Sequence, residues 1–187
     1  MKILPALVLL ATASTAHAQD APVVQIRSAI GASTYLHGDL DYTAPVALVS
    51  VRIGTPTVAL EPEFAYAWHA QQDSFAGVER SERATFQSIG FNVVRRWPGR
   101  VAPYVGGGVG VFAEHQHSTV VSPVFGTFVS DSTRGPRGGV QALGGVDVRV
   151  SSRLPAIAQG RYEMRSLQDP GGGSVWQVMG GVAFTIR

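Results

Sequence analysis

The sequence contains no cysteine and little charge. Its 187 residues include 15 Lys or Arg and 13 Asp or Glu, so charged residues form 15% of the chain, against about 25% in a typical soluble protein. The absence of cysteine excludes disulfides, thiolate catalysis and cysteine-ligated zinc. A formal net charge of +2 without a cluster of basic residues excludes the electrostatic signature of nucleic-acid binding.

The chain also lacks a hydrophobic run of the roughly 18 residues that a transmembrane helix needs. Its most apolar internal stretch, residues 101–113, is interrupted by proline and glycine. At the N-terminus, a positively charged start, an apolar stretch over 3–13 and Ala-His-Ala at 16–18 are typical of a secretory signal peptide. We therefore expect residues 1–18 to be removed on export and residues 19–187 to form one domain.

The dominant pattern in the remaining chain is alternation of apolar residues with polar or small ones. In residues 140–151 the even positions read Val, Ala, Gly, Val, Val, Val, while most odd positions are polar. A period of two is the pattern of a strand with one apolar face. It predicts eight strands, near residues 23–36, 43–53, 57–70, 82–96, 101–115, 138–151, 154–166 and 174–186.

The predicted connections alternate in length. Short turns at 54–56, 98–100 and 152–153 alternate with longer polar or glycine-rich segments at 37–42, 71–81, 116–137 and 167–173. Eight strands connected in this way indicate an all-β fold, an antiparallel up-and-down barrel. Strands of 11–15 residues are long enough to cross an outer membrane, although a soluble ligand-binding barrel alternates equally well with its faces exchanged.

The size of the lumen favours the transmembrane alternative. An eight-stranded barrel is just wide enough to be filled by side chains, and the apolar row carries several bulky aromatic rings. If the apolar row faces lipid, the inward row contains five arginines and five carboxylates that can neutralise one another, as buried charges require. This predicted lumen network consists of Arg27, Arg52, Arg149, Arg161 and Arg165 with Glu61, Glu63, Glu114, Asp147 and Glu163.

Aromatic residues are concentrated near the predicted strand ends, which indicates two girdles at the membrane boundaries. The predicted girdle residues are Tyr35, Tyr42, Tyr66, Trp68 and Trp176 at the long-loop end, with Trp97 and Tyr104 at the short-turn end. Four histidines (37, 69, 115 and 117) also fall at the long-loop end. We expect them to be ordinary polar rim residues rather than ligands of a metal site.

Two further features leave alternatives open. The inward glycines Gly106, Gly108 and Gly110 either open a water path or ligand cavity, or make room for Arg161 and Arg165. The segment 116–137 contains several valines and phenylalanines, too many for a solvated loop. It either extends two strands into a hairpin that packs on itself, or forms a projecting hairpin that contacts lipopolysaccharide or another partner.

Three segments carry a resemblance to a known family. The phrase Ala-Pro-Tyr-Val-Gly-Gly-Gly-Val-Gly at 102–110, Gly-Arg-Tyr-Glu at 160–163 and Gly-Gly-Val-Ala-Phe at 180–184 are similar to strands of the OmpA/OmpX-like outer-membrane β-barrels. The resemblance covers residues 19–187. It implies residence in the cell outer membrane, insertion by the outer-membrane machinery, contact with lipid and lipopolysaccharide, and a monomer.

Lipid A-modifying enzymes also occur on this scaffold. The deacylase family carries a His-x-Ser-Asn motif on its seventh strand, where this chain has Arg-Tyr-Glu-Met at 161–164, without a nucleophile and base. We therefore expect a non-enzymatic outer-membrane protein without a cofactor, with a structural or surface-interaction role. The alternatives are a narrow, porin-like channel or binder for a small hydrophobic solute, and a soluble periplasmic ligand-binding barrel.

Overall fold

The computed structural model describes residues 22–37, 40–151, 153–165 and 173–186. The predicted signal peptide lies outside the described residues. No helix in the described part of the chain is long and apolar enough to cross a bilayer.

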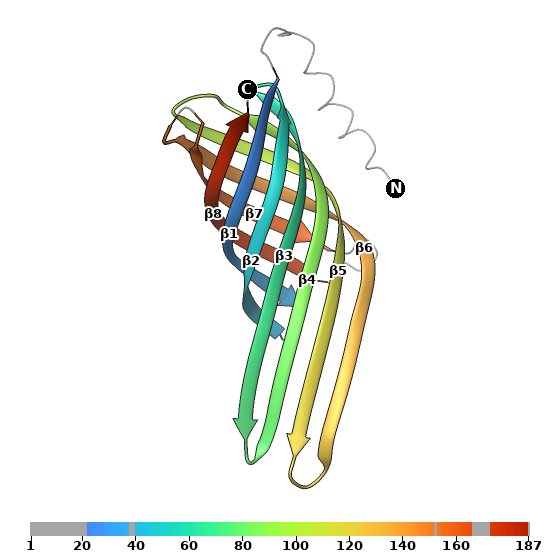
Figure 1. The fold of residues 1–187 in the computed structure, drawn as a ribbon. Helices are drawn as coiled ribbons and strands as arrows, with labels where there is room; N and C mark the ends of the chain where they lie inside the picture. The colour runs from blue at the N-terminus through green and yellow to red at the C-terminus, as the bar shows by residue number, and fades with distance from the viewer. Residues whose placement is uncertain (1–21, 38–39, 152, 166–172, 187) are drawn as a thin grey trace.

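Eight antiparallel strands close into a barrel in sequence order, with β1 paired to β8 (Figure 1). The strands are β1 (Val23–His37), β2 (Leu40–Gly54), β3 (Val58–Phe75), β4 (Val78–Arg96), β5 (Val101–Ser122), β6 (Gly126–Arg149), β7 (Pro155–Met164) and β8 (Ser174–Ile186). Because every strand pairs with its sequence neighbours, ring closure leaves no free edge within the barrel. The up-and-down topology predicted from the alternation is confirmed.

Four strands extend well beyond the ring, which the sequence indicated for residues 116–137 but not for 71–81. Pairing of β2 with β3 ends at Val46–Ala67, whereas β3 and β4 remain paired out to Phe75 and Val78. Strands β4, β5 and β6 remain paired over a similar length. The segment predicted as a loop at 71–81 is therefore mostly strand, and residues 116–137 form the hairpin that both sequence alternatives described. Together they form a four-stranded projecting sheet at the lower end of Figure 1.

Tight turns at the tips make this extension possible. Ala76 and Gly77 both have positive φ, 51° and 77°, as a two-residue hairpin turn that matches the strand twist requires. At the second tip, Gly126 has φ of 84°, and the Ser122 hydroxyl accepts hydrogen bonds from the amides of Val124 and Phe125. For residues 71–81, polar composition suggested a loop because this part of β3 and β4 is solvated on both faces, which removes the apolar alternation.

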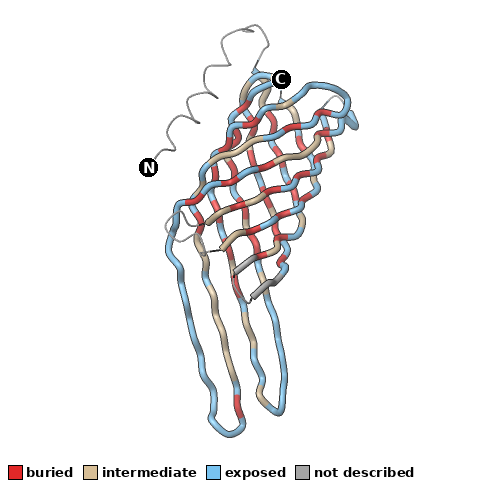
Figure 2. Tube along the Cα trace, turned by 180° about the vertical axis from the view of Figure 1, so that it is seen from behind, coloured by how far each residue is buried: buried red, intermediate tan, exposed pale blue. Residues whose placement is uncertain are grey.

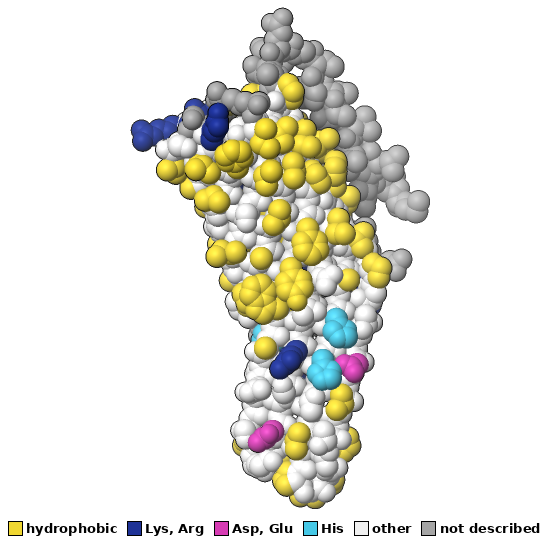
Figure 3. Space-filling model, in the orientation of Figure 1, with side chains coloured by type: hydrophobic (Ala, Val, Ile, Leu, Met, Phe, Trp, Pro, Cys, Tyr) yellow, Lys and Arg dark blue, Asp and Glu magenta, His cyan; other side chains and the backbone are white. Residues whose placement is uncertain are grey.

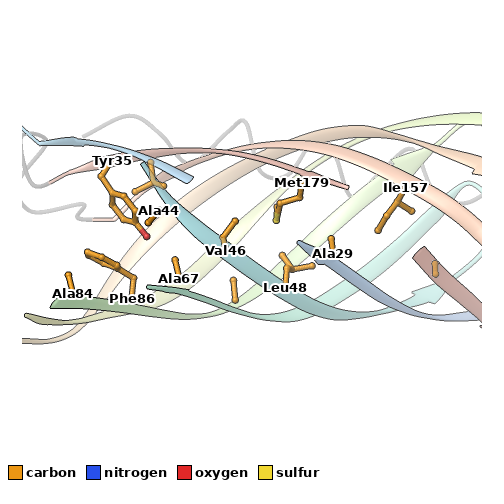
Figure 4. Close-up of a cluster of buried hydrophobic side chains, with 13 residues drawn as sticks. Ala29, Tyr35, Ala44, Val46, Leu48, Ala67, Ala84, Phe86, Ile157 and Met179 are labelled. Atoms are coloured by element: carbon orange, nitrogen blue, oxygen red, sulfur yellow. The ribbon is translucent and has the colours of Figure 1, made fainter. Parts of the chain in front are cut away.

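Within the ring, burial alternates residue by residue, as the inward and outward rows require (Figure 2). Small apolar side chains fill part of the lumen, including Val46, Leu48 and Met179 around Ala29 (Figure 4). Most of the large apolar side chains point outward and form an apolar belt on the barrel wall, one face of which is drawn in Figure 3. Its members include Ile26, Ile30, Val49, Ile53, Leu60, Phe64, Ile89, Phe91, Val105, Val109, Val140, Val178, Val182 and Phe184.

Candidate functional site: a charged lumen and a projecting sheet

The first of two charge clusters in the lumen lies toward the short turns. We call it the short-turn cluster; it consists of Arg27, Arg52, Arg96, Glu61, Asp147 and Tyr104. Strands β1, β2, β3, β4, β5 and β6 each contribute one inward residue to it. Because the members come from six strands, their contacts cross the lumen and brace its walls against one another.

Asp147 is the centre of this cluster. Its carboxylate is in ion-pair contact with Arg27 at 3.2 Å, Arg52 at 3.2 Å and Arg96 at 3.3 Å. Glu61 takes a second pair of contacts, to Arg52 at 2.7 Å and Arg27 at 3.5 Å. Three guanidinium groups therefore share two carboxylates, which leaves one excess positive charge in this part of the lumen.

Tyr104 completes the short-turn cluster. Its hydroxyl accepts a hydrogen bond from Arg27 at 2.8 Å and donates one to Gln159 at 2.9 Å. The Arg27 and Arg52 guanidiniums lie 4.9 and 4.4 Å from the centre of its ring. This cation–π contact adds electrostatic stabilisation to groups withdrawn from water.

The second cluster, the loop-side cluster, lies toward the long connections. It consists of Glu63, Arg161, Glu163 and Arg165. Arg161 contacts both carboxylates, donating a hydrogen bond to Glu63 and lying 3.5 Å from Glu163. Gln141 donates a hydrogen bond of 2.7 Å to Glu63. Two positive and two negative charges balance here, unlike in the short-turn cluster.

Arg165 closes the lumen at its long-loop mouth. Its guanidinium is hydrogen-bonded to Glu163 at 3.0 Å and lies 4.8, 5.3 and 5.6 Å from the ring centres of Tyr35, Phe86 and Phe112. Three aromatic rings and one carboxylate thus surround a single cation. This arrangement fills the mouth with side chains.

The structure places eight of the ten predicted network residues in the two clusters and the remaining two elsewhere. Arg149 follows Asp147 in the inward row but is the last residue of β6 and is exposed at the rim. Glu114 lies just beyond a register shift between Phe112 and Glu114. It therefore belongs to the projecting sheet, where it pairs with Arg134 at 3.7 Å.

Sequence reasoning missed Arg96, whose side chain is 16% exposed at the short-turn mouth. The signal was present, because Arg96 shares the inward row of β4 with Ser88 and Asn92. Alternation specifies the face of a strand-end residue but not whether the barrel wall still encloses it. Arg96 and Arg149 both follow an inward row to its end, and only one of them is enclosed.

Two predicted girdle tyrosines are also placed differently. Tyr35 and Tyr104 are buried in the lumen, not at the membrane boundary. The three tryptophans, Trp68, Trp97 and Trp176, are exposed on the outer surface near the strand ends. The Tyr42 side chain lies outside the described residues.

The inward glycines of β5 serve close packing against the neighbouring strand rather than space for Arg161 and Arg165. A Cβ built on Gly108 would lie 2.0 Å from the Phe91 carbonyl oxygen and 2.6 Å from the Asn92 amide oxygen. One on Gly106 would lie 2.7 Å from the Val93 oxygen. Glycines that do make room for the charge network lie on other strands: a Cβ on Gly90 would meet Glu63 at 2.7 Å, and one on Gly145 would meet the Tyr104 hydroxyl at 2.6 Å.

The substitution Gly108→Ala is expected to lower the free energy of unfolding by about 1–3 kcal/mol, because the added methyl overpacks against backbone that has little freedom to move. Urea unfolding of the vesicle-inserted protein, followed by tryptophan fluorescence, measures this loss. Gly144→Ala is the matched control, since its Cβ would meet its nearest neighbour at an ordinary 3.7 Å. Equal losses in the two variants would show that close packing at Gly108 is unimportant.

Two small cavities lie at the ends of the lumen. One of about 10 Å³ lies between Gln25, Arg52 and Arg96 at the short-turn end. Another of about 30 Å³ lies between Phe112, Glu114 and Arg165 at the other end. Each has room for one or a few water molecules. Neither geometry favours the channel alternative or a pocket for a hydrophobic solute.

The projecting sheet carries the described histidines. His115 and His117 lie on its outer face, where His115 is hydrogen-bonded to Thr133 at 2.9 Å and His117 to Asp131. No group of three or more potential metal ligands forms among the described residues. The His37 side chain lies outside the described residues, and His69 belongs to the base of the projecting sheet on β3.

No protein-family model and no curated protein sequence matches this chain. Among solved structures, Neisserial surface protein A (NspA) is 16% identical, covering 88% of this chain and 97% of its own, with a TM-score of 0.63. OprG from Pseudomonas aeruginosa is 12% identical, covering 90% and 98%, with a TM-score of 0.61.

Ail, the attachment invasion locus protein of Yersinia pestis, solved in complex with the heparin analogue sucrose octasulfate, is 16% identical, covering 90% of this chain and 100% of its own, with a TM-score of 0.59. At these identities the likeness concerns the fold. The chain accordingly has the fold of the small eight-stranded outer-membrane β-barrels, as its resemblance to OmpA/OmpX-like proteins implied.

Proposed function

We propose that this protein is a non-enzymatic barrel of the cell outer membrane that presents the projecting sheet as a contact surface. The observation that carries the proposal is the orientation of the wall: an outward apolar belt surrounds a lumen filled by paired charges. A soluble ligand-binding barrel needs the opposite arrangement. In a bilayer, the belt replaces water contacts with hydrocarbon contacts.

The absence of catalysis is supported by the contacts of β7. Where the deacylase motif would stand, Arg161 and Glu163 are committed to ion pairs in the loop-side cluster. Tyr162 points outward, with its ring 4.8 Å from that of Trp176 and its hydroxyl 2.8 Å from the Ser174 hydroxyl. Arg161 and Glu163 thus pack in the lumen and Tyr162 packs on the outer wall, which supports a structural role for β7.

The contact role is supported by the form of the projecting sheet. Its tips carry exposed apolar side chains, among them Phe75, Val124, Phe125 and Phe128. Along its outer edges, residues 68–75 of β3 and 126–139 of β6 lie beyond the pairing with β2 and β7. Strand edges that pair with no other described strand, beside apolar side chains, suit a protein partner or lipopolysaccharide.

The sulfated ligand in the Ail structure has less support here. The projecting sheet carries four arginines and five carboxylates, namely Arg80, Arg83, Arg134 and Arg137 with Asp73, Glu79, Glu82, Glu114 and Asp131. This near-neutral balance gives a polyanion little electrostatic attraction. We expect the chain to be a monomer inserted by the outer-membrane machinery.

An epitope inserted between Ala76 and Gly77 is expected to bind antibody on intact Gram-negative cells, because this tip would project from the outer surface. The same epitope between Pro98 and Gly99, in a short turn, should bind only after the outer membrane is permeabilised. Flow cytometry measures both.

The folding control for these insertions is a shift in gel mobility on boiling in SDS, which folded outer-membrane barrels show. Labelling of the short-turn epitope on intact cells, or recovery of the folded protein in the aqueous periplasmic extract, would contradict the proposal.

A further inference from the structure

Charged side chains are distributed unequally between the two ends of the molecule. At the short-turn end, four exposed arginines form what we call the arginine collar: Arg95, Arg100, Arg149 and Arg153. The described strand ends and turns around them, residues 22–24, 54–58, 95–103, 148–151, 153–156 and 184–186, contain no acidic residue. The projecting sheet at the other end mixes both signs of charge.

The arginine collar lies at the edge of the apolar belt. The Arg95 guanidinium lies 5.6 Å from the ring centre of Trp97, which is itself 46% exposed on the outer surface. The backbones of Arg149 and Arg100 are joined by a hydrogen bond of 2.8 Å. On the face drawn in Figure 3, dark-blue side chains stand beside the upper end of the yellow belt, and magenta ones occur only on the projecting sheet.

The lumen reinforces this positive end. Three arginines share two carboxylates in the short-turn cluster, and Arg96 holds the outermost place at the mouth. Asp147 is already in contact with three guanidiniums, and no described carboxylate forms an ion pair with the collar. Within the described part of the chain, the collar is therefore left without a neutralising carboxylate, which makes it a candidate site for anions from the surroundings.

We propose that the arginine collar binds the phosphate groups of anionic phospholipids in the leaflet that surrounds the short-turn end. This inference rests on the proposed membrane function. A guanidinium is well suited to phosphate, and the edge of an apolar belt is where lipid headgroups lie. A single basic side chain near an anionic lipid surface contributes enough attraction for about a fivefold preference for an anionic lipid over a neutral one.

Trp97 reports on lipid contact at the collar. The chain has three tryptophans, so Trp68→Phe with Trp176→Phe leaves Trp97 as the single probe. This variant is refolded into phosphatidylcholine vesicles that contain either brominated phosphatidylglycerol or brominated phosphatidylcholine, and fluorescence quenching is measured. Because one collar arginine, Arg95, lies beside Trp97, we expect the lipid site at Trp97 to show a relative affinity of about fivefold for the anionic lipid. This preference should fall toward onefold at high salt because the interaction is screened.

Two sets of arginine substitutions separate the collar from overall charge. Replacing the four collar arginines by glutamine should abolish the preference, whereas R80Q/R83Q/R134Q/R137Q in the projecting sheet should preserve it. Measuring the salt dependence of quenching in the protein that keeps all of its arginines tests the same electrostatic attraction, without a variant that risks misfolding. A chain that retains only Trp68 serves as the probe at the other end and should show equal quenching by both lipids.

The outcomes separate this proposal from the membrane function. Equal quenching of Trp97 by the two brominated lipids overturns the lipid-binding proposal while leaving membrane insertion intact. If such a protein instead sediments with purified cell-wall sacculi in a collar-dependent manner, the collar belongs to a wall polymer and the proposal is equally overturned. Absence of quenching by either lipid overturns the membrane function, and the collar proposal falls with it.

Discussion

The substitution Asp147→Asn is expected to lower the free energy of unfolding by about 3–5 kcal/mol, the usual cost of removing one partner from a buried ion pair. The amide keeps the shape of the side chain, so the loss reports on charge. Asp147 is fully buried and contacts three arginines, which would be left with Glu61 alone. Urea unfolding of the vesicle-inserted protein measures the change.

Two matched controls come from residues that the sequence assigned to the same network. Glu114→Gln removes a carboxylate whose only described ion pair is at 3.7 Å to a half-exposed arginine, and Arg149→Gln removes an exposed charge. Each should cost at most about 1 kcal/mol, as for exposed pairs generally. Adding Arg96→Gln to Asp147→Asn should recover part of the loss. Similar losses for Asp147→Asn and Glu114→Gln would refute the central role of Asp147.

The substitution Val178→Arg should lower the free energy of unfolding by about 2–4 kcal/mol, the cost of a basic residue on the lipid face of a barrel near the bilayer midplane. Val178 lies in the middle of β8, is 73% exposed and belongs to the apolar belt. In water, an arginine at so exposed a position would cost little. The same vesicle-based unfolding experiment measures the effect.

Val129→Arg is the control, because Val129 is 59% exposed on the projecting sheet, beyond the belt. We expect its effect to be close to zero. If Val178→Arg and Val129→Arg destabilise the protein to the same small extent, the belt does not face hydrocarbon, and the proposed location in the outer membrane is wrong.

The charge network shows which features of the lumen can be predicted from alternation along a strand. Arg27, Glu61 and Arg161 fall in inward rows, and all three are buried in the lumen. Sequence alternation identifies such residues because a pleated strand turns successive side chains to opposite faces. It does not give the height of a residue along the barrel, which depends on strand stagger, so the exposure of Arg149 was not predictable.

The projecting sheet shows a different limit. Residues 71–75 and 126–137 carry no clear apolar alternation, yet they are strands. They are ordered by backbone pairing with neighbours and by the tight turns at Ala76–Gly77 and Gly126. In the projecting sheet, β3 to β6 continue the pairing that they already have within the ring. The ring therefore sets the register of the sheet beyond it. For residues 71–75, local sequence therefore indicates a loop where the tertiary structure continues a sheet, whereas the valines and phenylalanines of 116–137 did indicate a hairpin.

The amino-acid sequence by itself determined the number of strands, their order and the face of each that points outward, because these follow from a period of two and from the sizes of the side chains. Only the tertiary structure decided which charges meet, since an ion pair across the lumen joins residues that no sequence spacing relates. It also decided where the wall ends, and hence that Arg96 is enclosed while Arg149 joins the arginine collar. Closure of the ring sets both, because it fixes the stagger of each strand against the next.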